Sequence, residues 1–211
     1  MAGCCGHDAK FDGVSNDYKR RLWIVITLNA IMFGVEMTAG HLAKSQALQA
    51  DALDFISDAL TYGISLAVIG ASVQARTNAA LFKSLSLLLM GAWVLGSTAY
   101  RVFYQDVPTA EIMGIVGFLA LLTNLASVAL LVRYKDGDAN VRSVWLCSRN
   151  DAIGNVAVMI AALAVWESAS GWPDLIVAAI MAGLFLSSAI QILHQALAER
   201  AETMDHIQSG R

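Results

Sequence analysis

Residues 50–60 read ADALDFISDAL and place three aspartates, Asp51, Asp54 and Asp58, in a segment otherwise apolar enough to cross a membrane. Because a helix turns by about 100° per residue, these three positions share one face. One ionised aspartate at the centre of a bilayer costs roughly 2.5 to 3.5 kcal/mol, so intramembrane acids usually mark an ion or proton pathway. This stretch therefore predicts a membrane helix with a functional polar face.

A second apolar stretch, WLCSRNDAIGN at residues 145–155, repeats the pattern with its polar side chains four residues apart. If the two helices are antiparallel, Asp54 is level with Asp151, and Asp58 is level with Cys147. The two pairs are then about 6 Å, or one helical turn, apart along the helices. Four side chains that converge from two adjacent turns can form a tetrahedron, the geometry that zinc-like ions favour. The predicted metal ligands are therefore Asp54, Asp58, Cys147 and Asp151.

Three further polar residues accompany this set. Asp51 and Asn155 continue the same two stripes by one turn, so we expect them to support the ligands or to line the access path. Glu36 lies in the preceding apolar segment and is expected to support the site or to shuttle protons.

The ligand types indicate which ion is bound. A thiolate beside three carboxylates suits Zn²⁺ or Cd²⁺ better than Mg²⁺ or Ca²⁺. The alternative for Cys147 is a small buried apolar residue, which would leave Mn²⁺, Fe²⁺ or Co²⁺ open. We expect no permanently bound cofactor, because the ion is cargo.

The composition identifies a membrane protein, since 57% of the 211 residues are hydrophobic and 15% are charged. Apolar segments of at least about 20 residues predict an all-α, six-helix transmembrane bundle in the lipid bilayer. The net charge of −3 and the lack of a basic stripe argue against a nucleic-acid partner. The predicted helices lie at residues 22–43, 47–73, 79–104, 112–133, 143–166 and 174–197. Residues 1–21 and 198–211 are the predicted N-terminal and C-terminal tails.

The basic residues predict the orientation. Most lysines and arginines fall on the side of the membrane where the N-terminus lies, whereas Lys44 and Arg101 fall on the other side. Both termini are therefore predicted to be cytoplasmic, in a bacterial cytoplasmic membrane. Residues 1–20 lack the apolar core of a signal peptide, and their Cys4-Cys5-Gly-His7 is either an ion-capturing tail or a tail without function.

Three stretches carry a resemblance to a known family: Glu36 and Gly40 followed by SQALQADALDFISDAL at residues 45–60, residues 147–155, and Asn124. In these stretches the chain resembles the cation diffusion facilitator family of divalent-metal/proton antiporters. The resemblance implies a transporter and not an enzyme, with cytoplasmic termini and a homodimer, for which we expect Gly91 and Gly96 to allow close approach. The chain departs from the family in having Cys147 at a common histidine position, and we expect it to lack the usual cytoplasmic domain after the last helix.

Metal ligation requires deprotonated oxygen and sulfur, so one site can hold either a divalent ion or protons. This exchange predicts efflux of the metal, driven by an inward proton gradient, by alternating access. Two alternatives are open. A passive cation channel would ignore a pH gradient, and an intramembrane aspartyl protease would cleave peptide bonds with two acids.

Overall fold

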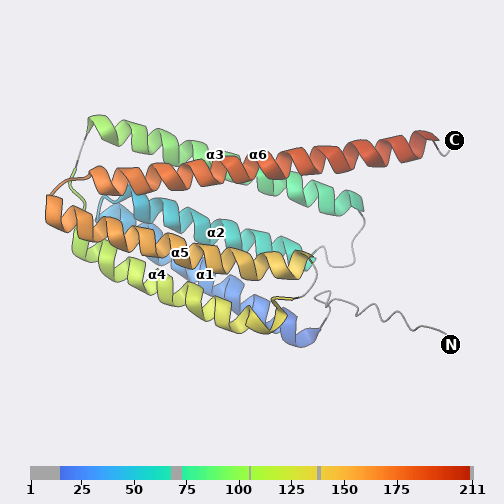
Figure 1. Cartoon of the computed structure of the whole chain (residues 1–211), viewed down its shortest axis with the longest axis horizontal. Coiled ribbons are helices and arrows are strands. Elements are labelled where there is room, and N and C mark those ends of the chain that lie inside the picture. The colour runs from blue at the N-terminus through green and yellow to red at the C-terminus, as the bar shows by residue number, and fades with distance from the viewer. Residues whose placement is uncertain (1–14, 68–72, 105, 137–138, 210–211) are drawn as a thin grey trace, which may run out of the picture.

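The computed structural model describes residues 15–67, 73–104, 106–136 and 139–209. Within these ranges the chain forms helices and turns without strands, which confirms the all-α prediction (Figure 1). The helices are α1 (Asn16–Leu42), α2 (Gln46–Ala67), α3 (Val73–Phe103), α4 (Ala110–Leu131), α5 (Ala139–Ser168) and α6 (Trp172–Ser209), and a 3-10 turn, η1 (Val132–Tyr134), follows α4.

Five of these helices are long and apolar enough to span a membrane, counted over the described residues. The helix outside this set is α2, whose 22 residues include Asp51, Asp54 and Asp58. The chain is therefore a multi-pass membrane protein, and α2 as a sixth membrane-spanning helix stays a prediction.

Several helices extend beyond their predicted bounds. α1 begins at Asn16 and not at residue 22, and α6 continues to Ser209 and not only to residue 197. Hydropathy detects the apolar part of a helix, whereas residues 198–209 are mostly good helix formers such as alanine and glutamate and extend the helix without being apolar. The predicted tails therefore contain helical residues.

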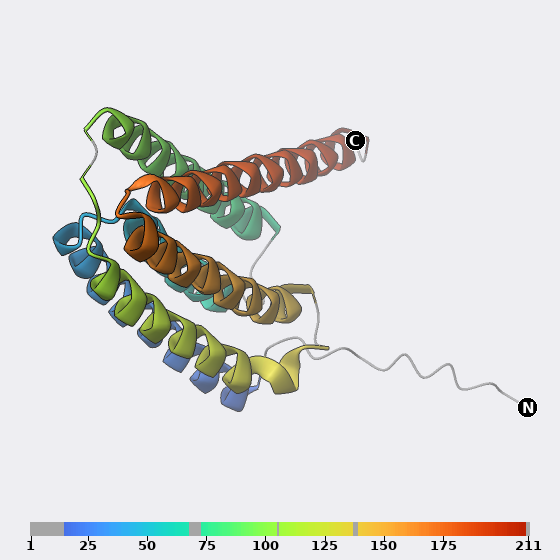
Figure 2. The same ribbon diagram turned by 60° about the vertical axis from the view of Figure 1, so that its left-hand side comes forward.

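The helices pack mainly in three pairs, α1 with α2, α4 with α5, and α3 with α6. Figure 2 shows that α6 begins beside the end of α5 and diverges from it toward its own end, while α3 crosses α6. We call the end of the bundle with Asn16 and Ser209 the terminal end, and the end with the α1–α2 turn at residues 43–45 the far end.

Gly91 on α3 is part of the α3–α6 contact. A Cβ atom at this position would lie 2.9 Å from Leu186 on α6, so the glycine allows close approach of the two helices within one chain. Its predicted place at a dimer contact is therefore wrong, because α6 already occupies that face. A Cβ at Gly96 would meet no atom of the described residues within 4 Å.

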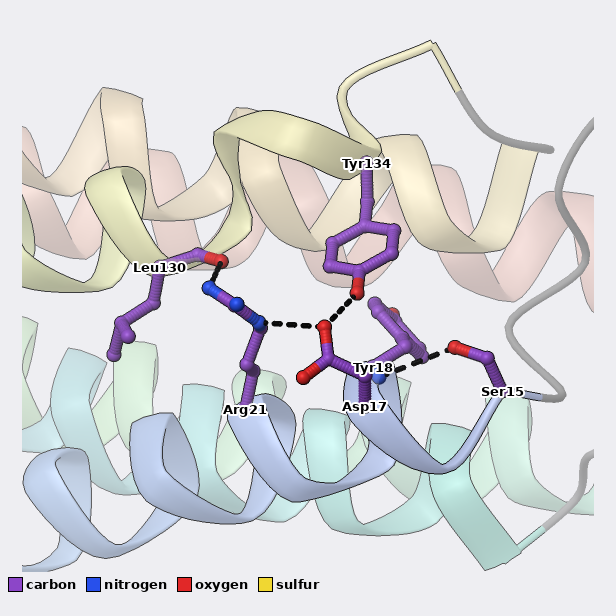
Figure 3. Close-up of polar contacts among 6 residues, drawn as sticks. All are labelled: Ser15, Asp17, Tyr18, Arg21, Leu130 and Tyr134. Carbon is purple, nitrogen blue, oxygen red and sulfur yellow. Dashed lines mark hydrogen bonds and ion pairs between the residues drawn. The ribbon is translucent and has the colours of Figure 1, made fainter.

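At the terminal end, polar contacts join the start of α1 to the end of α4 (Figure 3). The Ser15 hydroxyl caps the first turn of α1 at 3.2 Å. Asp17 forms an ion pair with Arg21 at 2.9 Å and accepts a hydrogen bond from the Tyr134 hydroxyl at 2.5 Å. Arg21 also donates to the carbonyl of Leu130 at 3.3 Å, so the first turns of α1 are attached to α4 and η1.

At the far end, Asp174 of α6 caps α2. Its carboxylate accepts hydrogen bonds from the Ser45 hydroxyl (2.6 Å) and from the backbone N–H groups of Gln46 (2.8 Å) and Ala47 (3.0 Å). These N–H groups have no partner inside the helix, and the positive end of the helix dipole favours the carboxylate. Asp174 is only 1% exposed, so this contact holds α2 and α6 together inside the bundle.

Candidate metal centre

A cavity of about 390 Å³ lies between α2, α3, α5 and α6. On α3 it is lined by Lys83 and Leu87, which belong to the first half of that helix, and on α6 it extends as far as Gln195. The cavity therefore occupies the half of the bundle nearer the terminal end. Its acidic and sulfur-bearing lining residues are Asp54, Asp58, Cys147 and Asp151.

These are the four ligands predicted from the sequence, and the structure brings them to one cavity. The Asp151 carboxyl lies within hydrogen-bonding range of both Asp54 and Asp58. No donor in the described protein reaches the buried Oδ2 of Asp151. Carboxylate oxygens this close repel one another unless a cation or a proton lies between them, so the arrangement suits both kinds of occupant.

The cavity is not a closed tetrahedral site. In the described part of the chain, no group of three or more His, Cys, Asp and Glu side chains is gathered tightly enough to hold an ion as it stands. The facing side chains of α2 and α5 would have to turn toward a common centre, and the ligand set stays a prediction.

Tyr62 is a site residue that the sequence reasoning missed. Its hydroxyl, on a fully buried side chain, donates a hydrogen bond to Asp58 Oδ2 and lies 3.4 Å from the hydroxyl of Ser148 on α5. Tyr62 therefore orients the carboxyl group of Asp58, a residue that lines the cavity. The signal was present in the sequence, because Tyr62 follows Asp58 by four residues just as Asp58 follows Asp54, so the three side chains share one helix face.

Lys83 is the second residue that was missed as part of the site. The sequence placed it only among the basic residues of the cytoplasmic side, but in the structure its half-buried side chain lines the same cavity as the acids. A lysine ammonium at this place balances part of the negative charge of the site when no metal is bound. No local pattern in the sequence indicates that α3 would bring it there.

Asp51 and Asn155 lie outside the cavity lining and bind each other. The Asn155 amide donates to Asp51 Oδ2 at 2.6 Å, and Asn124 of α4 donates to Asn155 Oδ1 at 2.8 Å. All three side chains are buried. Asp51 and Asn155 thus lie outside the cavity lining, and whether they support the ligands or line the access path stays a prediction.

Glu36 of α1 is fully buried beside Asp51. Neither of its carboxyl oxygens has a hydrogen-bond partner in the described protein, so it extends this polar group of residues without being satisfied by it. Cys4, Cys5 and His7, for which ion capture and a tail without function were both open, lie outside the described residues.

The family model for the cation efflux transmembrane domain matches residues 22–199. Among curated proteins, the chain is 26% identical to the metal cation efflux system protein CzcD of Cupriavidus metallidurans over 192 residues, which cover 82% of this chain and 60% of that protein. It is 26% identical to the zinc transporter ZitB of Pectobacterium atrosepticum over 87% of this chain and 61% of that protein. It is 24% identical to the cadmium, cobalt and zinc/H(+)-K(+) antiporter of Bacillus subtilis over 83% of this chain and 63% of that protein.

The chain thus spans less than two thirds of the length of these curated relatives. The family model, in contrast, matches most of the chain, including every residue of the cavity described above. The chain therefore belongs to the cation diffusion facilitator family, which consists of cation transporters and not of enzymes.

Proposed function

We propose that this protein exports a divalent transition-metal cation, Zn²⁺ or Cd²⁺, from the cytoplasm in exchange for protons. The observation that carries the proposal is the single cavity lined by Asp54, Asp58, Cys147 and Asp151, with carboxyl groups that face one another. The relatives named for cation efflux, zinc transport and cadmium, cobalt and zinc antiport support this substrate class.

The exchange follows from competition for the same atoms. Without metal, protons on the aspartate oxygens relieve the repulsion between the carboxyl groups, and Lys83 offsets part of the remaining charge. A divalent ion binds only the deprotonated oxygens and sulfur, so its arrival releases protons. Protons that return from the other side displace the metal and reset the site.

Alternating access fits the way in which the helices pack. The cavity lies nearer the terminal end, whereas the Asp174 contact holds the far end together. We propose that the α3–α6 pair rocks against the other four helices, which closes the terminal end and releases the far end. The basic residues support a cytoplasmic terminal end, which makes this the inward-facing state. The homodimer implied by the family resemblance stays a prediction.

Metal flux should depend on the pH gradient. Consider proteoliposomes in which the cytoplasmic face of the protein faces the outer solution and zinc is added to that solution. An acidic lumen should accelerate zinc entry, because lumenal protons leave as zinc enters. Raising the lumenal pH by one unit should slow entry by up to about tenfold for each coupled proton, which is about 1.4 kcal/mol of driving force. Stopped-flow measurement with a zinc dye and a pH dye in the lumen tests both movements.

Two controls separate the alternatives. Liposomes without protein report the passive leak, and liposomes with equal pH on both sides report the uncoupled rate. Zinc entry at the same rate with and without the gradient would refute exchange and would favour the passive channel.

Cys147→Ser should change the metal preference. A thiolate is a softer ligand than a hydroxyl, so the affinity for Cd²⁺ should fall by about tenfold or more and that for Zn²⁺ by less. The test is calorimetric titration of both metals, together with X-ray absorption at the cadmium edge, in a Cys4→Ser/Cys5→Ser background that leaves Cys147 as the remaining cysteine. If Cys147 is only a small apolar residue, both affinities stay unchanged and no cadmium–sulfur distance is lost.

A further inference from the structure

Glu36 is a buried acid that the cavity does not use. Its side chain is fully buried on α1, and neither carboxyl oxygen receives a hydrogen bond from a described protein donor. The side chain within hydrogen-bonding range is Asp51 of α2, which is also a carboxyl group. Two carboxylates cannot form a hydrogen bond with each other, so the contact is favourable only when one of them carries a proton.

The other side of Asp51 is already occupied. Asn155 donates to Asp51 Oδ2, and because Asn155 Oδ1 accepts from Asn124, the orientation of the amide is fixed. The chain of donors therefore runs from α4 through α5 to α2 and ends at Asp51. Glu36 lies next to the end of this chain and receives no donor from it.

Among the described residues, the charges that act on Glu36 are negative. Asp51 and Asp54 of α2 repel a negative charge on Glu36. The other helix that packs against α1 is α4, and its acid Glu111 lies exposed in its first turn. Near the site, α4 contributes the neutral Asn124. Two buried, adjacent carboxylates without a cation would be strongly unfavourable, because both charges lose their hydration and repel each other. A proton shared by Glu36 and Asp51 removes this penalty.

We propose that Glu36 and Asp51 form a proton-binding site, separate from the metal cavity, that gives up its proton when a dication enters the cavity. Neither carboxyl lines the cavity, and a proton needs no cavity volume. Asp51 precedes Asp54 by three residues, about 4.5 Å along α2, so the charge of a bound dication reaches the pair through the protein interior. On release, the carboxyl O–H bond breaks, the proton passes to solvent, and the pair gains one negative charge opposite the dication.

The coupling to metal rests on the proposed function, and the test is designed to separate the two. The number of protons released per zinc ion bound is measured with a pH indicator in weakly buffered liposomes that contain the full chain. Glu36→Gln should release about one proton fewer than the wild-type protein at saturating zinc, because one titrating group is removed. Its zinc affinity should stay within threefold, and the exposed-site variant Glu167→Gln of α5 should match the wild-type protein in both quantities.

Infrared difference spectra give a second readout that needs no transport. The carbonyl band of protonated buried carboxyls should be present in the wild-type protein at neutral pH and should be lost on zinc binding, and the loss should be smaller by the contribution of one carboxyl in Glu36→Gln, because the cavity aspartates contribute in both proteins. A wild-type protein without this band overturns the inference even if the variant fails to fold. If Glu36→Gln releases as many protons as the wild-type protein, this inference alone fails, whereas a wild-type protein that binds zinc without releasing protons refutes the proposed function.

Discussion

Replacing Asp58 with asparagine should weaken zinc binding by more than about 100-fold, since changes to outer-shell groups alone typically cost 10- to 100-fold in metal affinity. Asparagine has nearly the same size as aspartate, and its carbonyl oxygen can still accept the hydrogen bond from Tyr62. The substitution therefore removes the negative charge and one anionic ligand while it preserves packing. Asp151→Asn should have a similar effect, because Asp151 faces Asp54 and Asp58 across the same cavity.

The measurements are zinc affinity by calorimetry and zinc-driven proton movement in proteoliposomes. The matched control is Asp106→Asn. Asp106 is exposed, forms an ion pair with Lys44 at 3.1 Å and does not line the cavity, so this variant should leave both quantities unchanged. Zinc transport by Asp58→Asn at the wild-type rate would show that the metal does not use this cavity. A loss that is matched by Asp106→Asn would instead indicate a general effect on the protein.

The sequence predicted the acids of the cavity because helix periodicity is local information. Asp54 with Asp58, and Cys147 with Asp151, are each four residues apart, so each pair shares a helix face whatever the rest of the fold does. That these two faces meet required only that α2 and α5 be neighbours. The structure adds that Asp51 and Asn155, each about one helical turn from the predicted ligands on its helix, are hydrogen-bonded to each other.

Lys83 and Asp174, unlike Tyr62, were missed because their contacts depend on the packing of distant helices. Lys83 of α3 reaches the cavity, and Asp174 of α6 reaches the start of α2, because of the positions of these two helices, which no local spacing encodes. The same limit explains Gly91. A glycine in a membrane helix indicates close approach, but the sequence does not tell whether the approaching helix belongs to the same chain.

Replacing Asp174 should destabilise the far end of the bundle. Asp174→Ala removes the acceptor for the Ser45 hydroxyl and for the N–H groups of Gln46 and Ala47, all inside the protein. A buried donor that loses its partner costs about 1 to 3 kcal/mol, so the total loss should be at least about 3 kcal/mol. Asp174→Asn keeps one acceptor oxygen without the charge that the helix dipole favours, and its stability should lie between those of the alanine variant and the wild-type protein.

Thermal unfolding of the purified protein tests this order of stabilities. At roughly 2–4 °C per kcal/mol for a chain of this size, the midpoint for Asp174→Ala should fall by at least about 6 °C. Glu111→Gln, in the exposed first turn of α4, is the matched control and should leave the midpoint unchanged.

Because Asp174 joins α2 to α6, its loss should also favour the state in which the far end is open, so a cysteine introduced at Leu48 should react faster with a water-soluble maleimide in Asp174→Asn. An alanine variant with the wild-type midpoint, or unchanged labelling at Leu48, would show that this contact does not hold the far end closed.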